Sequence, residues 1–295
     1  MNSRKFTPIV SYLGPEASFT HVAGNYLFGA SSLSAQPTIP DCIEAVSSGR
    51  ATYAIVPLEN ALEGSVPLTI DYMFNDSDLF INAELSIPIE QHLMVNKKQA
   101  KLLDEIESVH SHPHALAQCH KYLMYQYRSI PLIQTTSTAA AAKYISENPD
   151  EKIAAIGNRL AAKRYGLHIA EENIHDFHFN HTRFVVLSRR KGLIDVPNHS
   201  DVPKTTLMVK LPEEDRSGVL HQVLSVFAWR KLNLSKIESR PLKTGLGNYF
   251  FIIDVIESEE HPMMIGALEE LATLNCQVRS FGTYYSYEQK PVRPN

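Results

Sequence analysis

The sequence predicts two successive domains: an α/β domain around a largely parallel sheet, and a smaller α+β domain of ferredoxin-like βαββαβ order. Three observations support this. Short apolar runs alternate with helical patterns through residues 1–190, as in βαβ units. Residues 191–204 are polar and contain two prolines and a glycine, which indicates a linker. Residues 205–285 then repeat strand and helix patterns in the βαββαβ order.

In the first domain, each apolar run precedes a segment with helical spacing. The pairs are PIVSYL with SFTHVAGNYLF, YAIVPL with PLTIDYMF, IESVHS with PHALAQCHKYL, and IAAIG with NRLAAKRYG. Parallel sheets bind ligands at the carboxyl ends of their strands. The junctions between these strands and helices are therefore where we expect functional residues.

In the second domain, TTLMVKL is a predicted strand, and Leu220, Val223, Leu224 and Phe227 follow at helical spacing. Strand patterns in LSKIESRP, NYFFIIDVI and CQVRSFGTYYS, with a helical MMIGALEELATL before the last, complete the order. The polar, proline-rich residues 286–295 are expected to form a disordered tail.

The composition excludes several classes of protein. Lys and Arg number 28 against 32 Asp and Glu, and no long basic run is present, so we expect no nucleic-acid partner. No stretch approaches the roughly 20 apolar residues of a membrane helix or resembles a secretory signal, which predicts a cytoplasmic protein without a membrane partner. Cys42, Cys119 and Cys276 are too widely spaced for a CxxC motif and are expected to be reduced thiols.

Four junctions place polar residues where a strand should end and a helix begin. Such corners offer unpaired backbone N–H groups and the positive end of a helix dipole. Taken singly, each is more simply explained by ordinary helix capping. The junctions are Gly14 to Ser18, Glu59-Asn60 with Gly64-Ser65, Ser111 to Pro113, and Thr136-Ser137-Thr138.

A fifth polar cluster, Asn180-His181-Thr182-Arg183-Phe184, leads into the apolar strand FVVLS. Arg183 carries a fixed fork of donors suited to a carboxylate, and the Thr182 hydroxyl can donate or accept a hydrogen bond. A surface ion pair for Arg183 and a strand-start role for Thr182 are equally compatible with the sequence.

These segments together resemble a known family. YLGPEASFTH, PLENALEGSVPLTID, HSHPHALAQC, TTSTAAAA, GNRLAAKRYGL and NHTRF resemble the ordered motifs of monofunctional prephenate dehydratases, and KIESRP after a GVL helix resembles the attached ACT regulatory domain. The resemblance covers nearly the whole chain. It implies a catalytic domain of two α/β lobes, similar to type II periplasmic binding proteins, which close on prephenate in the cleft between them.

The implied reaction converts prephenate to phenylpyruvate in L-phenylalanine biosynthesis, with neither cofactor nor metal. Prephenate carries two carboxylates, which suit a cleft lined by helix N-termini and one arginine. We expect Thr182 to hydrogen-bond or protonate the leaving hydroxyl and Arg183 to grip a carboxylate. A threonine is a poor acid, so Glu59 or a water is expected to supply the proton.

The resemblance implies further site residues. Phe184, Glu59, Asn60, Ser111 and Gln118 complete the expected catalytic group, and the expected substrate contacts are Ser18, Ser137, Thr138 and Asn180. Two positions depart from the family, which commonly has Ser where this chain has Ala61 and Gln where it has His114. Those two contacts are not carried over, although His114 could substitute as a donor.

For the second domain, the resemblance implies that L-phenylalanine is an allosteric ligand and that the chain forms a homodimer or homotetramer. An exposed ion pair between Glu238 and Arg240 is the simpler alternative for those two residues. The expected ligand-binding residues are Gly218, Val219, Leu220, Glu238, Ser239, Arg240 and Pro241.

Two other functions compete with this one. His110, His112 and His114 alternate, with His120 nearby, which is a spacing that zinc ligands can have, but Pro113 interrupts the strand that such a site would need. The two-lobed fold also serves non-catalytic solute receptors, and fold alone does not separate a receptor from an enzyme. Turnover of prephenate would separate the two, because a receptor binds its ligand but does not consume it.

Overall fold

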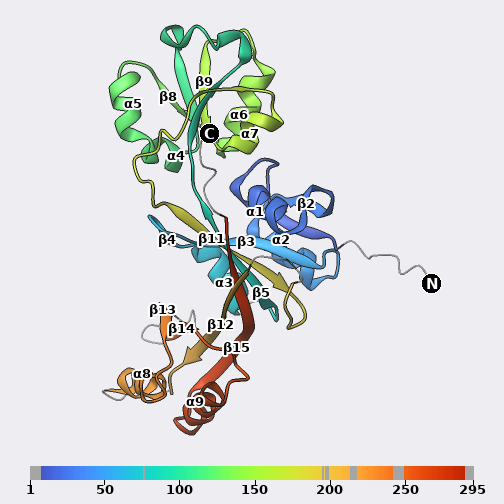
Figure 1. Cartoon of the computed structure of the whole chain (residues 1–295), viewed down its shortest axis with the longest axis vertical. Coiled ribbons are helices and arrows are strands. Elements are labelled where there is room, and N and C mark those ends of the chain that lie inside the picture. Colours follow the sequence, from blue (N-terminus) through green and yellow to red (C-terminus); the bar gives the residue numbers. More distant parts are fainter. Residues whose placement is uncertain are drawn as a thin grey trace, which may run out of the picture. The chain divides into compact units, whose positions relative to one another are not determined.

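A computed structural model describes residues 8–75, 77–194, 196, 199–212, 218–241 and 249–289 (Figure 1). The chain divides into two compact units, which we describe separately. Unit 1 comprises Met1–Ile70, Ser86–Phe184 and Gln289–Asn295, and unit 2 comprises Asp71–Leu85 and Val185–Glu288. In the part of the chain that the structure describes, no helix is long and apolar enough to cross a membrane.

Unit 1 contains two lobes. The elements of the first lobe are β1 (Val10–Leu13), α1 (Phe19–Phe28), β2 (Leu33–Gln36), α2 (Ile39–Ser47), β3 (Tyr53–Asn60), β4 (Gly64–Ser65), and parts of α3 (Pro67–Asn75), β5 (Phe80–Pro88) and β11 (His181–Ser188). A short 3-10 helix, Ala30–Ser32, precedes β2. In the sheet, β1 lies between β2 and β3 and is parallel to both, and β11 follows β3.

Two successive residues of β1 anchor the two helices that cover this sheet. Ser11 Oγ donates a hydrogen bond to the carbonyl of Cys42 in α2 at 2.9 Å, and the next residue, Tyr12, stacks on His21 in α1 with ring centroids 4.9 Å apart. Successive strand residues point to opposite faces. Helices α1 and α2 therefore cover opposite faces, as the alternating strand and helix patterns predict.

The second lobe is a five-stranded sheet with the order β10-β6-β9-β7-β8. Strand β7 is parallel to β8 and β9, whereas β6 is antiparallel to β9 and β10. Its elements are β6 (His92–Val95), β7 (Ser108–Ser111), α4 (Pro113–Gln118), α5 (His120–Gln126), β8 (Leu132–Gln134), α6 (Thr138–Glu147), β9 (Ile153–Gly157), α7 (Arg159–Arg164) and β10 (His168–Glu171), with 3-10 turns at Lys97–Gln99 and Leu103–Glu105.

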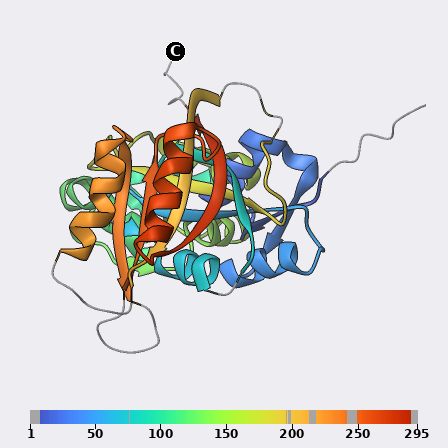
Figure 2. The ribbon, with the colours of Figure 1, turned by 90° about the horizontal axis from the view of Figure 1, so that it is seen from below.

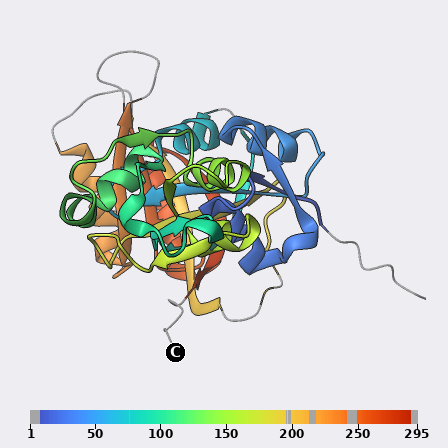
Figure 3. The ribbon, with the colours of Figure 1, turned by 90° about the horizontal axis from the view of Figure 1, so that it is seen from above.

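Helices cover both faces of this second sheet (Figures 1 and 3). Ala154 and Ile156 of β9 belong to a buried cluster with residues of α4 and α5. Ile153 and Ala155, which alternate with them, belong to a cluster with residues of α6 and α7. A sheet that is covered twice needs apolar residues at every position, which is why IAAIG is uniformly apolar.

Unit 2 has the predicted βαββαβ order. The elements are β12 (His199–Lys210), α8 (Val219–Trp229), β13 (Leu234–Pro241), β14 (Tyr249–Val255), α9 (Pro262–Thr273) and β15 (Gln277–Glu288). The strands lie in the order β13-β14-β12-β15, each antiparallel to its neighbour. Helices α8 and α9 pack side by side on one face (Figure 2), over a core that includes Leu207, Val209 and Phe227.

The opposite face of this sheet also has a covering within unit 2. Phe74, at the end of α3, packs against Phe250 and Phe281, with ring centroids 5.9 and 4.4 Å apart respectively. The β-strand alternation that turns Leu207 and Val209 toward α8 and α9 leaves Met208 on this second face. Unit 2 therefore buries apolar side chains on both sides of its sheet.

Two expected boundaries differ from the structure. Residues 199–204 of the expected linker lie in β12, and residues 286–288 of the expected tail lie in β15. The start of β12 pairs with the end of β15, out to His199 opposite Tyr287. Pro203 stands beside a register shift, where a residue without an N–H is tolerated. Residues 195, 197, 198 and 290–295 lie outside the described residues.

Candidate active site

Unit 1 contains a cavity of about 830 Å³ at the carboxyl ends of parallel strands. The last residues of β1, β2 and β3, namely Leu13, Gln36 and Asn60, line it from the first lobe. His112 and Thr136, which follow β7 and β8, line it from the second. This is the place at which α/β sheets bind ligands, and the volume suits a small molecule.

Two helices begin at this cavity. Ser18 caps α1 by accepting the His21 N–H at 3.2 Å, and Ser137 caps α6 by accepting the Ala140 N–H at 3.0 Å. Both serines line the cavity, as do Thr138 and Lys143. Helix N-termini and a lysine give this part of the cavity a positive potential, which favours an anionic ligand.

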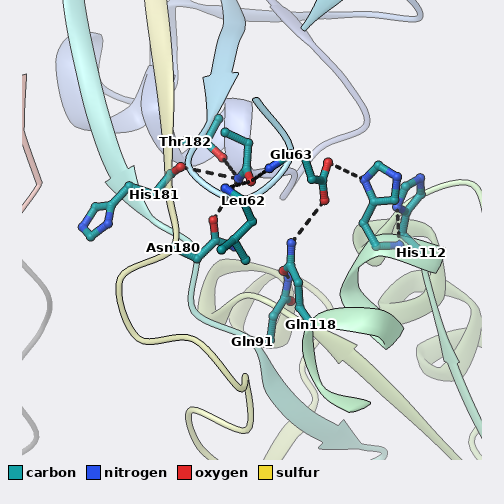
Figure 4. A network of polar contacts seen from close by, with 10 residues as sticks. Leu62, Glu63, Gln91, His112, Gln118, Asn180, His181 and Thr182 are labelled. Atoms are coloured by element: carbon teal, nitrogen blue, oxygen red, sulfur yellow. Dashed lines mark hydrogen bonds and ion pairs between the residues drawn. The ribbon is translucent and has the colours of Figure 1, made fainter. Parts of the chain in front are cut away.

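Asn60 holds Thr182 by a hydrogen bond inside the cavity (Figure 4). Asn60 Nδ2 donates to Thr182 Oγ1 at 2.9 Å and to Asn180 Oδ1 at 3.0 Å. Asn60 Oδ1 accepts the backbone N–H groups of Leu62 and Glu63 at 3.0 and 3.1 Å, so the amide orientation is determined. Because Thr182 Oγ1 accepts from Asn60, its own proton can be donated to a ligand.

A second polar chain joins the two lobes at the cavity (Figure 4). His114 Nδ1 lies 2.7 Å from Glu63 Oε2, and Glu63 Oε1 accepts from Gln118 Nε2 at 3.4 Å. Gln118 Oε1 in turn accepts from Gln91 Nε2 at 3.3 Å. All four side chains line the cavity.

Glu63 and Gln91 were not predicted as site residues. Glu63 lies in the ENALEGSV segment, three residues after Asn60, and this position is the signal that could have identified it. Gln91 directly precedes β6 and is 2% exposed. No sequence pattern distinguishes it from an ordinary residue at the start of a strand.

Arg183 and Glu59 lie elsewhere. Thr182 and Phe184 line the cavity, but Arg183, between them in β11, does not. Arg183 Nη1 lies 3.3 Å from Glu59 Oε2. Because strand residues alternate between faces, a strand that turns Thr182 and Phe184 into the cavity turns Arg183 away. Neither Arg183 nor Glu59 lines the cavity in this structure, and the direct grip of Arg183 on a carboxylate and the role of Glu59 as a proton source stay predictions.

Ser111 and Asn180 also lie outside the cavity lining. Ser111 is fully buried, and its Oγ donates to the carbonyl of Ile156 at 2.7 Å, which ties β7 to β9. Asn180 is 3% exposed and is held by Asn60. Both side chains therefore support the residues that line the cavity.

Burial controls protonation around the site. It is the main cause that lowers the pKa of His112, assisted by the neighbouring His114 and opposed by Glu63. Burial also raises the pKa of Tyr165, together with Glu16. Away from the cavity, burial raises the pKa of Cys42 to about 12, and Cys119 and Cys276 are buried free thiols as well, so none resembles an activated nucleophile.

The alternating histidines are not arranged as metal ligands. His110 Nε2 lies 2.9 Å from Ser108 Oγ, and its ring stacks on Tyr144. His112 caps α4 by accepting the His114 N–H at 3.3 Å. Within the described ranges, no group of three or more His, Cys, Asp and Glu side chains could hold a metal ion.

The expected regulatory residues lie on two elements of unit 2. Gly218 precedes α8 with φ of 90°, and Val219 and Leu220 form its first turn. Glu238 lies in β13, the edge strand, between Lys236 at 3.1 Å and Arg240 at 3.4 Å. These charged side chains share one face of β13, and Ser239 and Pro241 are exposed on the other.

Comparison with known proteins gives a consistent result. The sequence model of the family "Prephenate dehydratase" matches residues 10–192, and that of the "ACT domain" matches residues 205–273. A prephenate dehydratase of Bacillus subtilis is 50% identical over 283 residues, which are 95% of this chain and 99% of the relative.

Two solved structures are also similar. Prephenate dehydratase from Arthrobacter aurescens, solved with L-Phe, is 33% identical with a TM-score of 0.81, over 94% of this chain and 89% of that one. GqqA, described as a novel type of quorum-quenching acylase, is 27% identical with a TM-score of 0.81, over 94% and 98%. From these matches over nearly its whole length, the chain belongs to the prephenate dehydratase family and carries a C-terminal ACT domain.

Proposed function

We propose that unit 1 catalyses the decarboxylating dehydration of prephenate to phenylpyruvate, a step of L-phenylalanine biosynthesis. The observation that carries this proposal is the Thr182 hydroxyl, held by Asn60 inside a cavity at which α1 and α6 begin. The family membership and the 50% identical prephenate dehydratase of Bacillus subtilis support the same reaction.

The two carboxylates of prephenate fit the two helix N-termini. Ser18 and Ser137 mark the first turns of α1 and α6, each 10 residues long, and their remaining N–H groups can bind carboxylate oxygens. Lys143 adds a positive charge at the same cavity. Phe184 and Ile89, which also line the cavity, provide apolar contact for the ring.

The chemistry needs a donor at the leaving hydroxyl. The bond between the ring and its carboxylate breaks to release carbon dioxide, and that electron pair completes the aromatic ring as the ring C–O bond breaks. The departing oxygen takes one proton and leaves as water. Thr182 donates a hydrogen bond to this oxygen as its charge develops, which stabilises the transition state more than the bound substrate.

Three other residues position this group. The Arg183–Glu59 ion pair joins β11 to β3 and so holds Thr182 and Asn60 in register. Ser111 fixes the end of β7, from which His112 follows. These roles predict effects on the geometry of the site, without direct contact with the substrate.

We propose that unit 2 makes the enzyme responsive to L-phenylalanine. The ACT match and the relative solved with L-Phe support this ligand. The N-terminus of α8, where Gly218 has no side chain to cap the helix, can receive the carboxylate of the amino acid. Glu238, between two cations, is the candidate partner for its ammonium group.

The edge strand β13 supports self-association of the ACT domains as a homodimer or homotetramer. Its outer face exposes Ile237, whose relative exposure is 46%, and edge strands readily pair with another sheet. Light scattering on the purified chain would distinguish a homodimer from a homotetramer.

The three cysteines, all free and buried, support a reducing compartment such as the cytoplasm.

The test is phenylpyruvate formation from prephenate by the purified chain, in buffer with chelator and against a no-enzyme control for acid-catalysed conversion. Thr182→Val, which keeps the shape of the side chain, is the matched variant. Rapid formation that the variant loses supports the proposal. Binding of prephenate without turnover would indicate a receptor, and amide hydrolysis in its place would indicate an acylase.

A further inference from the structure

One loop of the first lobe is inserted into the core of the second lobe. Ala17 lies between β1 and α1, yet it is fully buried and belongs to a hydrophobic cluster of the second lobe. That cluster includes Ala139 and Ala142 of α6 and Ala161 of α7. Ala17 has φ of 65°, a left-handed conformation that is unfavourable for a residue with a side chain. The contacts that hold Ala17 in place must outweigh this strain.

Asn158 joins the same loop to α7 through both ends of its amide. Its Oδ1 caps α7 by accepting the Ala161 N–H at 2.9 Å. Its Nδ2 donates to the carbonyl of Ala17 at 2.8 Å, although 141 residues separate the two in the chain. Because the amide oxygen accepts a backbone N–H, the amide orientation is determined. Asn158 is 4% exposed, so the bond between the lobes is shielded from water.

A surface ion pair joins the two lobes beside this bond. Arg164, at the end of α7, donates through Nε to Glu16 Oε2 at 2.8 Å. The two side chains are 57% and 50% exposed respectively, so the ion pair is expected to contribute less than the buried amide bond. We call Glu16, Ala17, Asn158 and Arg164 the interlobe clasp.

The interlobe clasp adjoins both helix N-termini that line the cavity. Ser18, the cap of α1, directly follows Ala17, and its Oγ donates to the Leu13 carbonyl at 2.9 Å, which holds the loop and the start of α1 together. Ala139, in the same buried cluster as Ala17, lies in the first turn of α6 next to Thr138. Ser18 and Thr138 both line the cavity. The clasp therefore fixes the N-terminus of α1 relative to that of α6.

We propose that Asn158 is a positioning residue that sets the spacing of the two helix N-termini and so selects ligands with two carboxylates, an inference that rests on the proposed dehydratase reaction. A dianion gains from both N-termini only when they face one cavity at the right spacing. Asn158 does not line that cavity, so it acts through Ala17 and the start of α1. Without its bond, fewer molecules present both N-termini at once, and the apparent affinity for a dianion falls in proportion.

The first test is Asn158→Ser, because serine keeps an acceptor that can cap α7 but is too short to reach the Ala17 carbonyl. We expect the KM for prephenate to rise by about 10-fold, the typical effect of leaving one buried group without its partner. The kcat should stay close to that of the wild type, because Thr182 and Asn60 hold each other within the first lobe. Loss of folded protein alone would lower kcat and leave KM unchanged.

The matched control is Asn96→Ser. Asn96 also caps a helix of the second lobe, the 3-10 helix Lys97–Gln99, by accepting the Lys98 N–H at 3.1 Å. It does not line the cavity, and among the described residues it makes no hydrogen bond to the first lobe. This variant should retain the wild-type KM and kcat.

Arg164→Gln tests the interlobe clasp without changing a buried residue. It should raise the KM for prephenate by about 2-fold, the scale of an exposed ion pair. Arg159→Gln is its control, because Arg159 also lies in α7 and pairs at 2.9 Å with Glu172, with side chains 47% and 45% exposed. Glu172 follows β10 in the same lobe as Arg159, whereas Glu16 belongs to the other lobe. A higher KM for Arg164→Gln alone would therefore report the contact between the lobes.

The number of carboxylates on the ligand separates positioning from general damage to the cavity. Phenylpyruvate carries one carboxylate and can use only one of the two N-termini. Its inhibition constant should therefore stay near the wild-type value in Asn158→Ser, while the KM for prephenate rises in the same preparation.

Three results would overturn the proposal. One is a folded Asn158→Ser variant with the wild-type KM. Another is an inhibition constant for phenylpyruvate that rises as much as KM, which would mean that the cavity as a whole is damaged. If Asn158→Ser does not fold, equal KM values for Arg164→Gln and Arg159→Gln are the third. Failure of the dehydratase reaction itself is recognised separately, because the wild type would then form no phenylpyruvate.

Discussion

Asn60 Nδ2 donates a hydrogen bond to Thr182 Oγ1 across 2.9 Å, although 122 residues separate the two in the chain. The backbone supports the contact, because the Ala61 N–H binds the His181 carbonyl at 2.9 Å. The end of β3 and the start of β11 are thus held together by main-chain and side-chain bonds at the point where the reaction is proposed to occur.

Thr182→Val should lower kcat by about 10²–10³, the typical effect of removing one preorganised donor, with little change in the free energy of unfolding. Asn60→Ala should also lower kcat, because it releases the threonine. Since the two residues act as one unit, the double variant should lose much less than the product of the two single effects. Additive losses in kcat would show that they act independently.

Ser137→Ala removes the cap of α6 at the cavity. We expect it to reduce the free energy of unfolding by about 1 kcal/mol and to raise the KM for prephenate, because the first turn of α6 no longer holds its N–H groups toward the carboxylate. Thr38→Ala is the control: Thr38 caps α2 by accepting the Asp41 N–H at 3.2 Å and does not line the cavity. Equal changes in KM for both variants would contradict the proposal that the first turn of α6 binds a carboxylate of prephenate.

Arg183→Gln tests whether this residue acts through its ion pair. Its side chain is 15% exposed and that of Glu59 is 34% exposed, so loss of one partner should reduce the free energy of unfolding by about 1–2 kcal/mol, between the values for surface and buried pairs. The double variant, Arg183→Gln with Glu59→Gln, should recover part of the lost free energy of unfolding. A large rise in KM with unchanged stability would instead indicate direct contact with a carboxylate.

Acid should destabilise unit 1 through His92. This side chain is fully buried, and burial lowers its pKa to about 4. The unfolded chain therefore binds a proton at His92 between about pH 6.5 and pH 4 while the folded protein does not. The free energy of unfolding should fall by roughly 3 kcal/mol as pH decreases through that window, and this contribution should level off below it.

The measurement is denaturant unfolding at several pH values for the wild type, His92→Gln and the control His168→Gln. His92→Gln is expected to be less stable at pH 7, because the buried imidazole accepts the Asn173 N–H at 3.1 Å. Its stability should nevertheless vary less between pH 7 and pH 4. If the free energy of unfolding of His92→Gln varied with pH as steeply as that of the wild type, other groups would be the cause of the acid sensitivity.

Gly218→Ala tests the proposed phenylalanine site. Gly218 has φ of 90°, and apart from its chain neighbours no atom of the described residues lies within 4 Å of the position that a Cβ would occupy, so the cost is backbone strain of about 1–2 kcal/mol. Gly29, with φ of 74° and the same open space, is the matched control in unit 1. Both variants should lose similar stability, but only Gly218→Ala should weaken the response of activity to phenylalanine, as measured by titration.

Much of the fold could be predicted from local patterns. The alternation of apolar runs and helical spacing predicted an α/β domain, and the order of patterns after residue 205 predicted the βαββαβ domain. The two lobes of the first domain were implied only by the resemblance to the family. Ser18 and Ser137 were predicted at strand-to-helix junctions, and both cap helices at the cavity. The extent of β12 and β15 was not predicted, because strand length here depends on pairing between residues such as His199 and Tyr287.

The sequence by itself determined which segments form helices and strands, where helices begin, and which residue types are available at the junctions, because these follow from interactions between near neighbours. The tertiary structure alone decided which face of β11 turns inward, and so placed Thr182 in the cavity and Arg183 beside Glu59. It also brought Glu63 from one lobe to His114 in the other. Such contacts depend on how distant strands pair, which local patterns do not encode.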